Sequence, residues 1–126
     1  MRLLIVDDNS AIRSAMRSTL ENYDDVQIIG EAGNGEEAVQ QAATLHPDLI
    51  LMDVSMPVLD GLRAAKIIRK LYPMIRIVMF SMHKIGTFIE MAKELGVSGF
   101  VAKEDDGPSL RDAIDAIRHN KVYFPA

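Results

Sequence analysis

Five polar residues able to do chemistry come at the ends of four short apolar runs. In chain order these are Asp7 and Asp8 after Leu3–Val6, Asp53 after Leu49–Met52, Ser81 after Ile75–Phe80, and Lys103 after Gly99–Ala102. Carboxylate oxygens bind hard cations such as Mg²⁺ or act as nucleophiles, and hydroxyl and ammonium groups donate hydrogen bonds to anions. The set therefore has the groups needed to bind a cation and an anion together.

Asp53 stands at the end of an uninterrupted apolar run. Leu49–Met52 shows no alternation with polar residues, which is typical of a strand buried on both faces of a parallel sheet. Pro57 and Gly61 follow soon after it. In open α/β sheets, ligands bind outside the carboxyl ends of the strands. Asp53 is therefore either a reactive or metal-binding carboxylate or the N-cap of the helix that follows.

Apolar runs alternate with amphipathic segments along the whole chain. Together with Val26–Gly30, the four runs predict five strands. Four of the five expected helices cover about Asn9 or Ser10 to Asn22, Glu36–Leu45, Gly61–Leu71 and Pro108–Asn120. The remaining helix has Phe88, Met91, Ala92 and Leu95 on one face and ends at Gly96. The alternation indicates one α/β domain in which a parallel sheet has helices on both faces.

The polar residues that follow these strands converge, because the carboxyl ends of parallel strands meet at the same edge of the sheet. Three carboxylates brought together repel one another unless a cation lies among them. Oxygen ligands without sulfur favour a hard metal such as Mg²⁺. The sequence therefore predicts a Mg²⁺ site at this edge.

The composition excludes several other kinds of site. The 126 residues include no cysteine, which excludes disulfides, thiolate metal sites and cysteine nucleophiles. A net charge of −4 argues against direct binding of nucleic acid by these residues. No apolar run approaches the roughly 18 residues of a membrane span, and Asp7 comes too early for a signal peptide. We expect a soluble, cytoplasmic protein.

The chain resembles the receiver domain of two-component response regulators over essentially its whole length. The resemblance rests on Asp7-Asp8, on Asp53-Val54-Ser55-Met56-Pro57-Val58-Leu59-Asp60-Gly61, on Ser81 and on Lys103. Ser81-Met82-His83 and Gly96-Val97-Ser98-Gly99-Phe100 are most similar to receivers with a C-terminal helix-turn-helix domain. The resemblance implies a flavodoxin-like (βα)5 three-layer sandwich with strand order 2-1-3-4-5.

The resemblance also implies a role for each site residue. Asp53 would be the phosphoacceptor. Asp8, Asp53 and the backbone carbonyl of Ser55 would bind Mg²⁺ directly, with Asp7 acting through water. Ser81 and Lys103 would bind the phosphoryl group, and Ser81 and Phe100 would be the switch residues. Two positions depart from the usual pattern. Glu104 replaces the proline common after the lysine, so we expect a trans peptide bond and a less rigid loop. Met82 replaces a small residue, so we expect it to restrict access to the phosphoryl group.

The implied domain organisation is a receiver over residues 1–120. Residues 121–126 are expected to be the start of a linker or a C-terminal tail in a longer regulator. The expected partners are a histidine kinase or phosphotransfer protein and, on phosphorylation, a second copy of the chain. The expected output is transcription through a DNA-binding domain outside this chain, with no direct nucleic-acid or membrane binding by the receiver.

The implied function is a switch that catalyses only its own phosphorylation and slow dephosphorylation, rather than an enzyme with turnover. Two alternatives remain open: a Mg²⁺-dependent aspartyl-phosphate phosphohydrolase, or a stand-alone receiver acting through protein–protein interaction. Hydrolases of this kind usually carry an Asp-x-Asp pair, whose second acid protonates the leaving group. Here Ser55 stands two positions after Asp53, and Asn9 stands two positions after Asp7.

Overall fold

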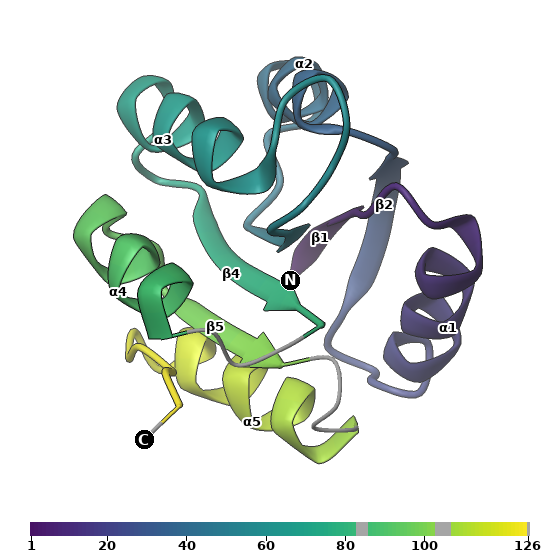
Figure 1. The fold of residues 1–126 in the computed structure, drawn as a ribbon. Coiled ribbons are helices and arrows are strands. Elements are labelled where there is room, and N and C mark those ends of the chain that lie inside the picture. The colour runs from purple at the N-terminus through teal and green to yellow at the C-terminus, as the bar shows by residue number, and fades with distance from the viewer. Residues whose placement is uncertain (83–85, 103–106, 126) are drawn as a thin grey trace.

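Strands and helices alternate along the described part of the chain (Figure 1). The structure is a computed structural model that describes residues 1–82, 86–102 and 107–125. Its elements are β1 (Arg2–Val6), α1 (Ser10–Leu20), β2 (Gln27–Ala32), α2 (Gly35–Leu45), β3 (Leu49–Asp53), α3 (Gly61–Leu71), β4 (Arg76–Ser81), α4 (Gly86–Leu95), β5 (Gly99–Ala102) and α5 (Gly107–Arg118). All ten elements expected from the sequence are present.

The five strands form one parallel sheet in the order β2-β1-β3-β4-β5. This order confirms the flavodoxin-like arrangement implied by the resemblance. The strands β1 and β3 lie side by side, with Val6 opposite Met52. On the other side of β3, Asp53 lies opposite Phe80 of β4. The tips of β1, β3 and β4 are therefore close together.

Successive residues of each strand face opposite helical layers. One face packs against α2, α3 and α4, and the other packs against α1 and α5. Figure 1 shows the sheet between these two groups of helices. The first face includes Leu4, Ile50, Ile77 and Phe100, and the second includes Leu3, Leu51, Val78 and Val101. Burial on both faces explains why the strands read as continuous apolar runs.

Short polar side chains fix the starts of three helices. Asn9 Oδ1 accepts from the backbone N–H of Ala11 at 2.9 Å, and Asn34 caps α2 in the same way. The N-cap of α3 is Asp60, which accepts from the N–H of Arg63 at 2.9 Å. The alternative that Asp53 caps the following helix is therefore wrong.

Several element ends differ from the predicted ones. The strand β2 continues to Ala32 rather than Gly30, because β1 keeps pairing with it up to Val6 opposite Ala32. The helix α1 ends at Leu20 rather than Asn22, where backbone hydrogen bonds close a turn. Gly96 ends α4 as predicted, with a φ of +79°.

The segment after α5 adds a short bridge to the sheet, a feature that the sequence did not indicate. Asn120 has a φ of +58°, so α5 does not continue through it. The N–H of Tyr123 donates to the carbonyl of Ser98 at 2.9 Å, and the N–H of Phe100 donates to the carbonyl of Tyr123 at 2.8 Å. Tyr123 therefore pairs with β5 on the side away from β4.

The described helices include none with both the length and the apolar character needed to cross a membrane.

Asp25, in the turn between α1 and β2, fastens α5 to the rest of the domain. Its carboxylate accepts from Arg111 at 3.0 Å and lies 2.5 Å from Nη1 of Arg118. The Arg111 guanidinium also lies 4.6 Å from the ring centroid of Tyr23. The hydrogen bond from Arg111 is the main reason that the pKa of Asp25 lies below its ordinary value of 3.8, and partial burial opposes this shift.

We expect Asp25→Asn to lower the free energy of unfolding at pH 7 by about 1 kcal/mol, the order found for partly exposed ion pairs. Because the folded-state pKa is lowered, this contribution is complete above the ordinary value of 3.8 and is lost as pH falls through the folded-state pKa. Urea unfolding followed by circular dichroism should show the difference in free energy of unfolding between wild type and variant shrinking as pH falls below the ordinary value of 3.8.

The matched control is Asp24→Asn, which removes the same charge from the exposed neighbouring position. Within the described residues no ion pair involves Asp24, so this change should leave the stability nearly unaltered. If the difference in free energy of unfolding between wild type and Asp25→Asn stayed constant across the pH range, this would contradict the role of the Asp25 carboxylate.

Candidate functional site

The carboxylates of Asp7, Asp8 and Asp53 form an acidic cluster at the carboxyl end of the sheet. Asp53 is the last residue of β3, and Asp7 directly follows β1, the strand beside it. One oxygen atom from each carboxylate lies within 4.8 Å of the others. Asp7 and Asp53 are 1% and 7% exposed, whereas Asp8 is exposed. The structure thus brings together the three acids that the sequence predicted to converge, with Asp8 on the solvent side.

Backbone hydrogen bonds fix the turn that carries Asp7 and Asp8. The N–H of Asp7 donates to the carbonyl of Ala32 in β2 at 3.1 Å. A carboxylate oxygen of Asp7 accepts from the N–H of Asn9 at 2.9 Å. Since Asn9 also caps α1, the first turn of that helix and the acidic turn form one unit.

Two glycines hold the loop between β3 and α3 against the site. A Cβ atom on Gly61 would lie 1.8 Å from the carbonyl oxygen of Asp53, and the N–H of Gly61 donates to the carbonyl of Val54 at 2.8 Å. Two residues before Gly61, the carbonyl of Leu59 accepts from the N–H of Gly35, the first residue of α2, at 2.9 Å. The loop therefore returns to the backbone of Asp53, and only glycine fits at the point of contact.

Val58, in the middle of this loop, has a left-handed backbone with a φ of +69°. A β-branched residue rarely adopts that conformation. Its side chain is exposed, so side-chain packing does not explain the strain. The N–H of Leu59 donates to the carbonyl of Pro57 at 2.8 Å, so a hydrogen bond between its two chain neighbours closes the tight turn around Val58.

Ser81 places a hydroxyl on the strand beside Asp53. It is the last residue of β4, one position beyond the residue that pairs with Asp53, and it is 6% exposed. Helix α4 begins only at Gly86, so Ser81 does not directly precede a helix. Met82 follows it and is 52% exposed.

The other predicted site residues fall in three different settings. Phe100 lies in β5 opposite Met79 and is fully buried in the core. Ser55 is exposed in the loop after β3. Lys103 and Glu104 lie outside the described residues. The roles assigned to these residues stay predictions.

The donor set of the acidic cluster fits a hard divalent cation. Mg²⁺ takes oxygen ligands at about 2.1 Å in an octahedron, so ligands on opposite sides of the ion are about 4.2 Å apart. The three carboxylate oxygens lie within 4.8 Å of one another, which is close enough for them to gather around one such ion. A cation among them would also offset the repulsion between three close negative charges.

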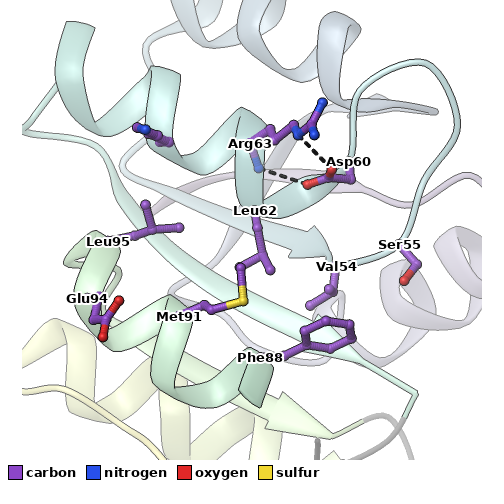
Figure 2. A pocket seen from close by; sticks show the side chains of 10 residues that line it. Val54, Ser55, Asp60, Leu62, Arg63, Phe88, Met91, Glu94 and Leu95 are labelled. Carbon is purple, nitrogen blue, oxygen red and sulfur yellow. Dashed lines mark hydrogen bonds and ion pairs between the residues drawn. The ribbon is translucent and has the colours of Figure 1, made fainter. Parts of the chain in front are cut away.

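A groove of about 690 Å³ lies between α3 and α4 beside the site. Figure 2 shows Phe88 and Met91 of α4 facing Val54 and Leu62 across it. Val54 and Ser55, which line one end of the groove, directly follow Asp53 in the chain. The groove therefore joins the loop of the acidic cluster to α4.

Sequence reasoning found the acids but missed the glycine contact that positions them. The sequence predicts Gly61 only as the start of a helix, although the Asp60-Gly61 pair is part of the resemblance. The available signal was a glycine close after the strand-end aspartate, since such glycines often allow close approach of two backbones. The partner of that approach, the carbonyl of Asp53, is visible only in the structure.

Comparison with known proteins gives a family match over most of the chain. The family model described as the response regulator receiver domain matches residues 3–115. A solved structure, that of a two-component response regulator of the LuxR family from Aurantimonas sp. SI85-9A1, superposes with a TM-score of 0.93 at 32% identity. That match covers 97% of this chain and 87% of the other.

Two relatives differ in what surrounds the matched region. The chain is 43% identical over 125 residues to the protein-glutamate methylesterase/protein-glutamine glutaminase 1 of Methanosarcina acetivorans, covering 94% of this chain and 36% of that protein. It is 30% identical over 125 residues to the transcriptional regulatory protein LnrK of Bacillus subtilis, covering 99% of this chain and 57% of that protein. The chain thus spans less than two thirds of the length of either relative.

We expect Gly61→Ala to lower the free energy of unfolding by about 1–3 kcal/mol, because the added methyl group must displace the backbone of Asp53. Gly86→Ala is the matched control, since it adds the same atom to a helix start where, among the described residues, the new Cβ would meet nothing within 4 Å beyond its chain neighbours and its own helix backbone. The control should be neutral or more stable by up to about 1 kcal/mol. Urea unfolding measures both values, and equal stabilities for the two variants would contradict the proposed contact.

Proposed function

The chain belongs to the response regulator receiver domain family, and we propose that it is a phosphorylation-controlled switch with Asp53 as the phosphoacceptor. The observation that carries the proposal is the convergence of Asp7, Asp8 and Asp53, whose oxygens lie within 4.8 Å of one another. A purely structural role accounts poorly for this cluster, because three close like charges destabilise a fold. Asp53 is the member at the tip of the central strand β3.

In the proposed reaction, a carboxylate oxygen of Asp53 attacks the phosphorus of a phosphohistidine on a partner kinase or phosphotransfer protein. The new O–P bond forms as the P–N bond breaks, and the released imidazole takes a proton from solvent. Later attack by water on the phosphorus releases inorganic phosphate and restores Asp53. Such transfers depend mainly on in-line positioning and on neutralising charge. The backbone contact between Gly61 and Asp53 supplies positioning.

Asp8, Asp53 and the backbone carbonyl of Ser55 would hold Mg²⁺, with Asp7 acting through a water molecule. When bound, the ion supplies positive charge that offsets the charge of the phosphoryl oxygens. Asp8 lies at the exposed side of the cluster, where a hydrated ion has access. The carboxylates of Asp7 and Asp53 reach the same position from two adjacent strands.

Ser81 and Lys103 would donate hydrogen bonds to the new phosphoryl oxygens. Hydrogen bonds to charged groups contribute about 1.5–3 kcal/mol each, so two supply roughly 3–6 kcal/mol. Moving a two-state equilibrium from 1:99 to 99:1 takes about 5.5 kcal/mol of differential interaction. Any pairing of Lys103 with Asp53 before phosphorylation reduces the difference between the two states. We therefore propose an incomplete shift, with the active conformer already populated before phosphorylation.

Helix α4 is the element we propose to move. Only Ala92 of α4 is fully buried, whereas α3 buries five residues of its length. The groove leaves space between α4 and the loop that follows Asp53. Phe100 is fully buried beneath this region, so a shift of Ser81 and α4 would require it to repack. The surface formed by α4, β5 and α5 would then carry the signal.

The rival activity is hydrolysis of small phosphoesters through an aspartyl phosphate. It needs a second acid near the leaving group, and the residue two positions after Asp53 is Ser55. Steady release of phosphate from such esters would favour the hydrolase. A stand-alone receiver that acts by protein–protein interaction would use the same site and would differ only in having no attached output domain.

We propose transcription control as the output, on the resemblance to receivers with helix-turn-helix domains and the match to LnrK. The match to a methylesterase supports a second candidate, in which the receiver controls an attached enzyme. The sequence of the gene around these codons discriminates the two. We place the switch in the cytoplasm, where histidine kinases present their phosphohistidine, with a second copy of the chain as a further partner after phosphorylation.

We expect acetyl phosphate and Mg²⁺ to add one phosphoryl group to the chain, and expect Asp53→Asn to abolish this addition. The product should be labile to base and to hydroxylamine, as an acyl phosphate is. Intact-protein mass spectrometry measures the change. An unchanged mass for wild type, or undiminished labelling of Asp53→Asn, would contradict the assignment of Asp53 as the phosphoacceptor.

We expect Ser81→Ala to accept phosphate at Asp53 but to respond weakly, because one of the two donors is lost. NMR spectra of wild type and variant with beryllofluoride, a phosphoryl mimic, should show smaller shifts for Phe100 and α4 in Ser81→Ala. Met82→Ala, at the exposed neighbouring position, controls for local disturbance. Equal shifts in wild type and Ser81→Ala would mean that Ser81 is not the coupling group.

A further inference from the structure

Arg13, in the first turn of α1, contacts the backbone of the turn that carries Asp7 and Asp8. Its Nη1 donates to the backbone carbonyl of Asp7 at 2.5 Å, and its Nε donates to a carboxylate oxygen of Glu31 at 3.0 Å. The Arg13 side chain is only 21% exposed. One guanidinium group therefore connects the turn after β1 to the edge strand β2.

Glu31 is itself fixed from three directions. Its second carboxylate oxygen accepts from Nη2 of Arg17 at 2.6 Å, so each of the two oxygens is bonded to a different arginine of α1. The Gln41 side chain donates to the backbone carbonyl of Glu31 at 2.7 Å. The hydrogen bond from Arg17, followed by that from Arg13, holds the pKa of Glu31 below its ordinary value of 4.5. Glu31 is thus a fixed, charged anchor for Arg13 at neutral pH.

We propose that Arg13 is a positioning residue for the acidic cluster, holding the peptide group between Asp7 and Asp8 in the orientation that brings both carboxylates to one cation. The proposal rests on the proposed function for the identity of that cation. The oxygen that Arg13 binds belongs to the peptide unit that joins the two acids. Because a peptide unit is planar, fixing its oxygen restrains the backbone on both sides of it.

The charge of Arg13 and its positioning role have opposite effects on metal binding. A positive charge close to the cluster repels a divalent cation, so removing the charge alone would tighten Mg²⁺ binding. Removing a group that orients metal ligands weakens binding, typically by about 10-fold or more. The direction of the change therefore separates the two roles.

Arg17 provides a matched control. It lies one turn further along α1 and also binds Glu31 through its guanidinium. Unlike Arg13, it makes no described contact with Asp7 or Asp8. Arg17→Ala therefore removes the same charge and one half of the same ion-pair network, and leaves the acidic turn bonded to Arg13.

The test is a Mg²⁺ titration of the wild-type chain and its variants by NMR or calorimetry, with thermal unfolding measured in parallel. We expect Arg13→Ala to raise the Mg²⁺ Kd about 10-fold, with Asp8→Ala as the reference for a lost ligand. Arg17→Ala should change the Kd by less than about twofold while lowering the unfolding temperature by a similar amount to Arg13→Ala. Arg13→Lys keeps the repelling charge but cannot bond Asp7 and Glu31 together, so its Kd should be at least as high as that of Arg13→Ala.

A second measurement, hydrogen exchange of the Asp7 and Asn9 amides without metal, does not depend on Mg²⁺. Both amides are hydrogen bonded in the acidic turn, so Arg13→Ala should speed their exchange about 10-fold and Arg17→Ala should not. An unchanged or lower Kd for Arg13→Ala, or equal effects of the two alanine variants, would overturn the positioning role. Failure of the wild type to bind Mg²⁺ would instead contradict the proposed function, and the amide exchange would still decide the role of Arg13.

Discussion

The repulsion among three carboxylates at the strand tips is the constraint on which the rest of this structure depends. Side chains left free would move apart, yet the oxygens of Asp7, Asp8 and Asp53 lie within 4.8 Å of one another. The positions are imposed by the backbone: Asp53 ends a strand that is buried on both faces, and Gly61 packs directly against its carbonyl. The apolar sheet thus provides the rigidity that keeps mutually repelling groups in place.

Much of this arrangement could be predicted from the sequence. The uninterrupted run before Asp53 indicated a buried central strand, and polar residues after other runs indicated a shared edge. The strand order came from the resemblance, because no local pattern specifies which strand pairs with which. The strand β2 extends two residues past its predicted end at Gly30, because Glu31 and Ala32 pair with Ile5 and Val6.

The parts that could not be predicted depend on contacts between residues distant in the sequence. Nothing local to Gly61 shows that it meets the carbonyl of Asp53, and nothing local to Arg13 shows that it reaches both Asp7 and Glu31. Such contacts follow from how the loops fold back onto the sheet. The pairing of Tyr123 with β5 is of the same kind, because no local pattern in residues 121–126 indicates a partner strand.

The bridge made by Tyr123 has a consequence for how the sheet meets other molecules. An open parallel sheet has two outer strands whose unpaired N–H and C=O groups can recruit strands from other chains. At β5, Tyr123 already occupies the groups of Ser98 and Phe100 that point outward. At β2, the register shifts opposite Leu3 and Leu4, and the charged Glu31 lies near the end of the strand. Both borders of the sheet are therefore poor templates for edge-to-edge association, which protects this α/β domain from aggregation through its open sheet.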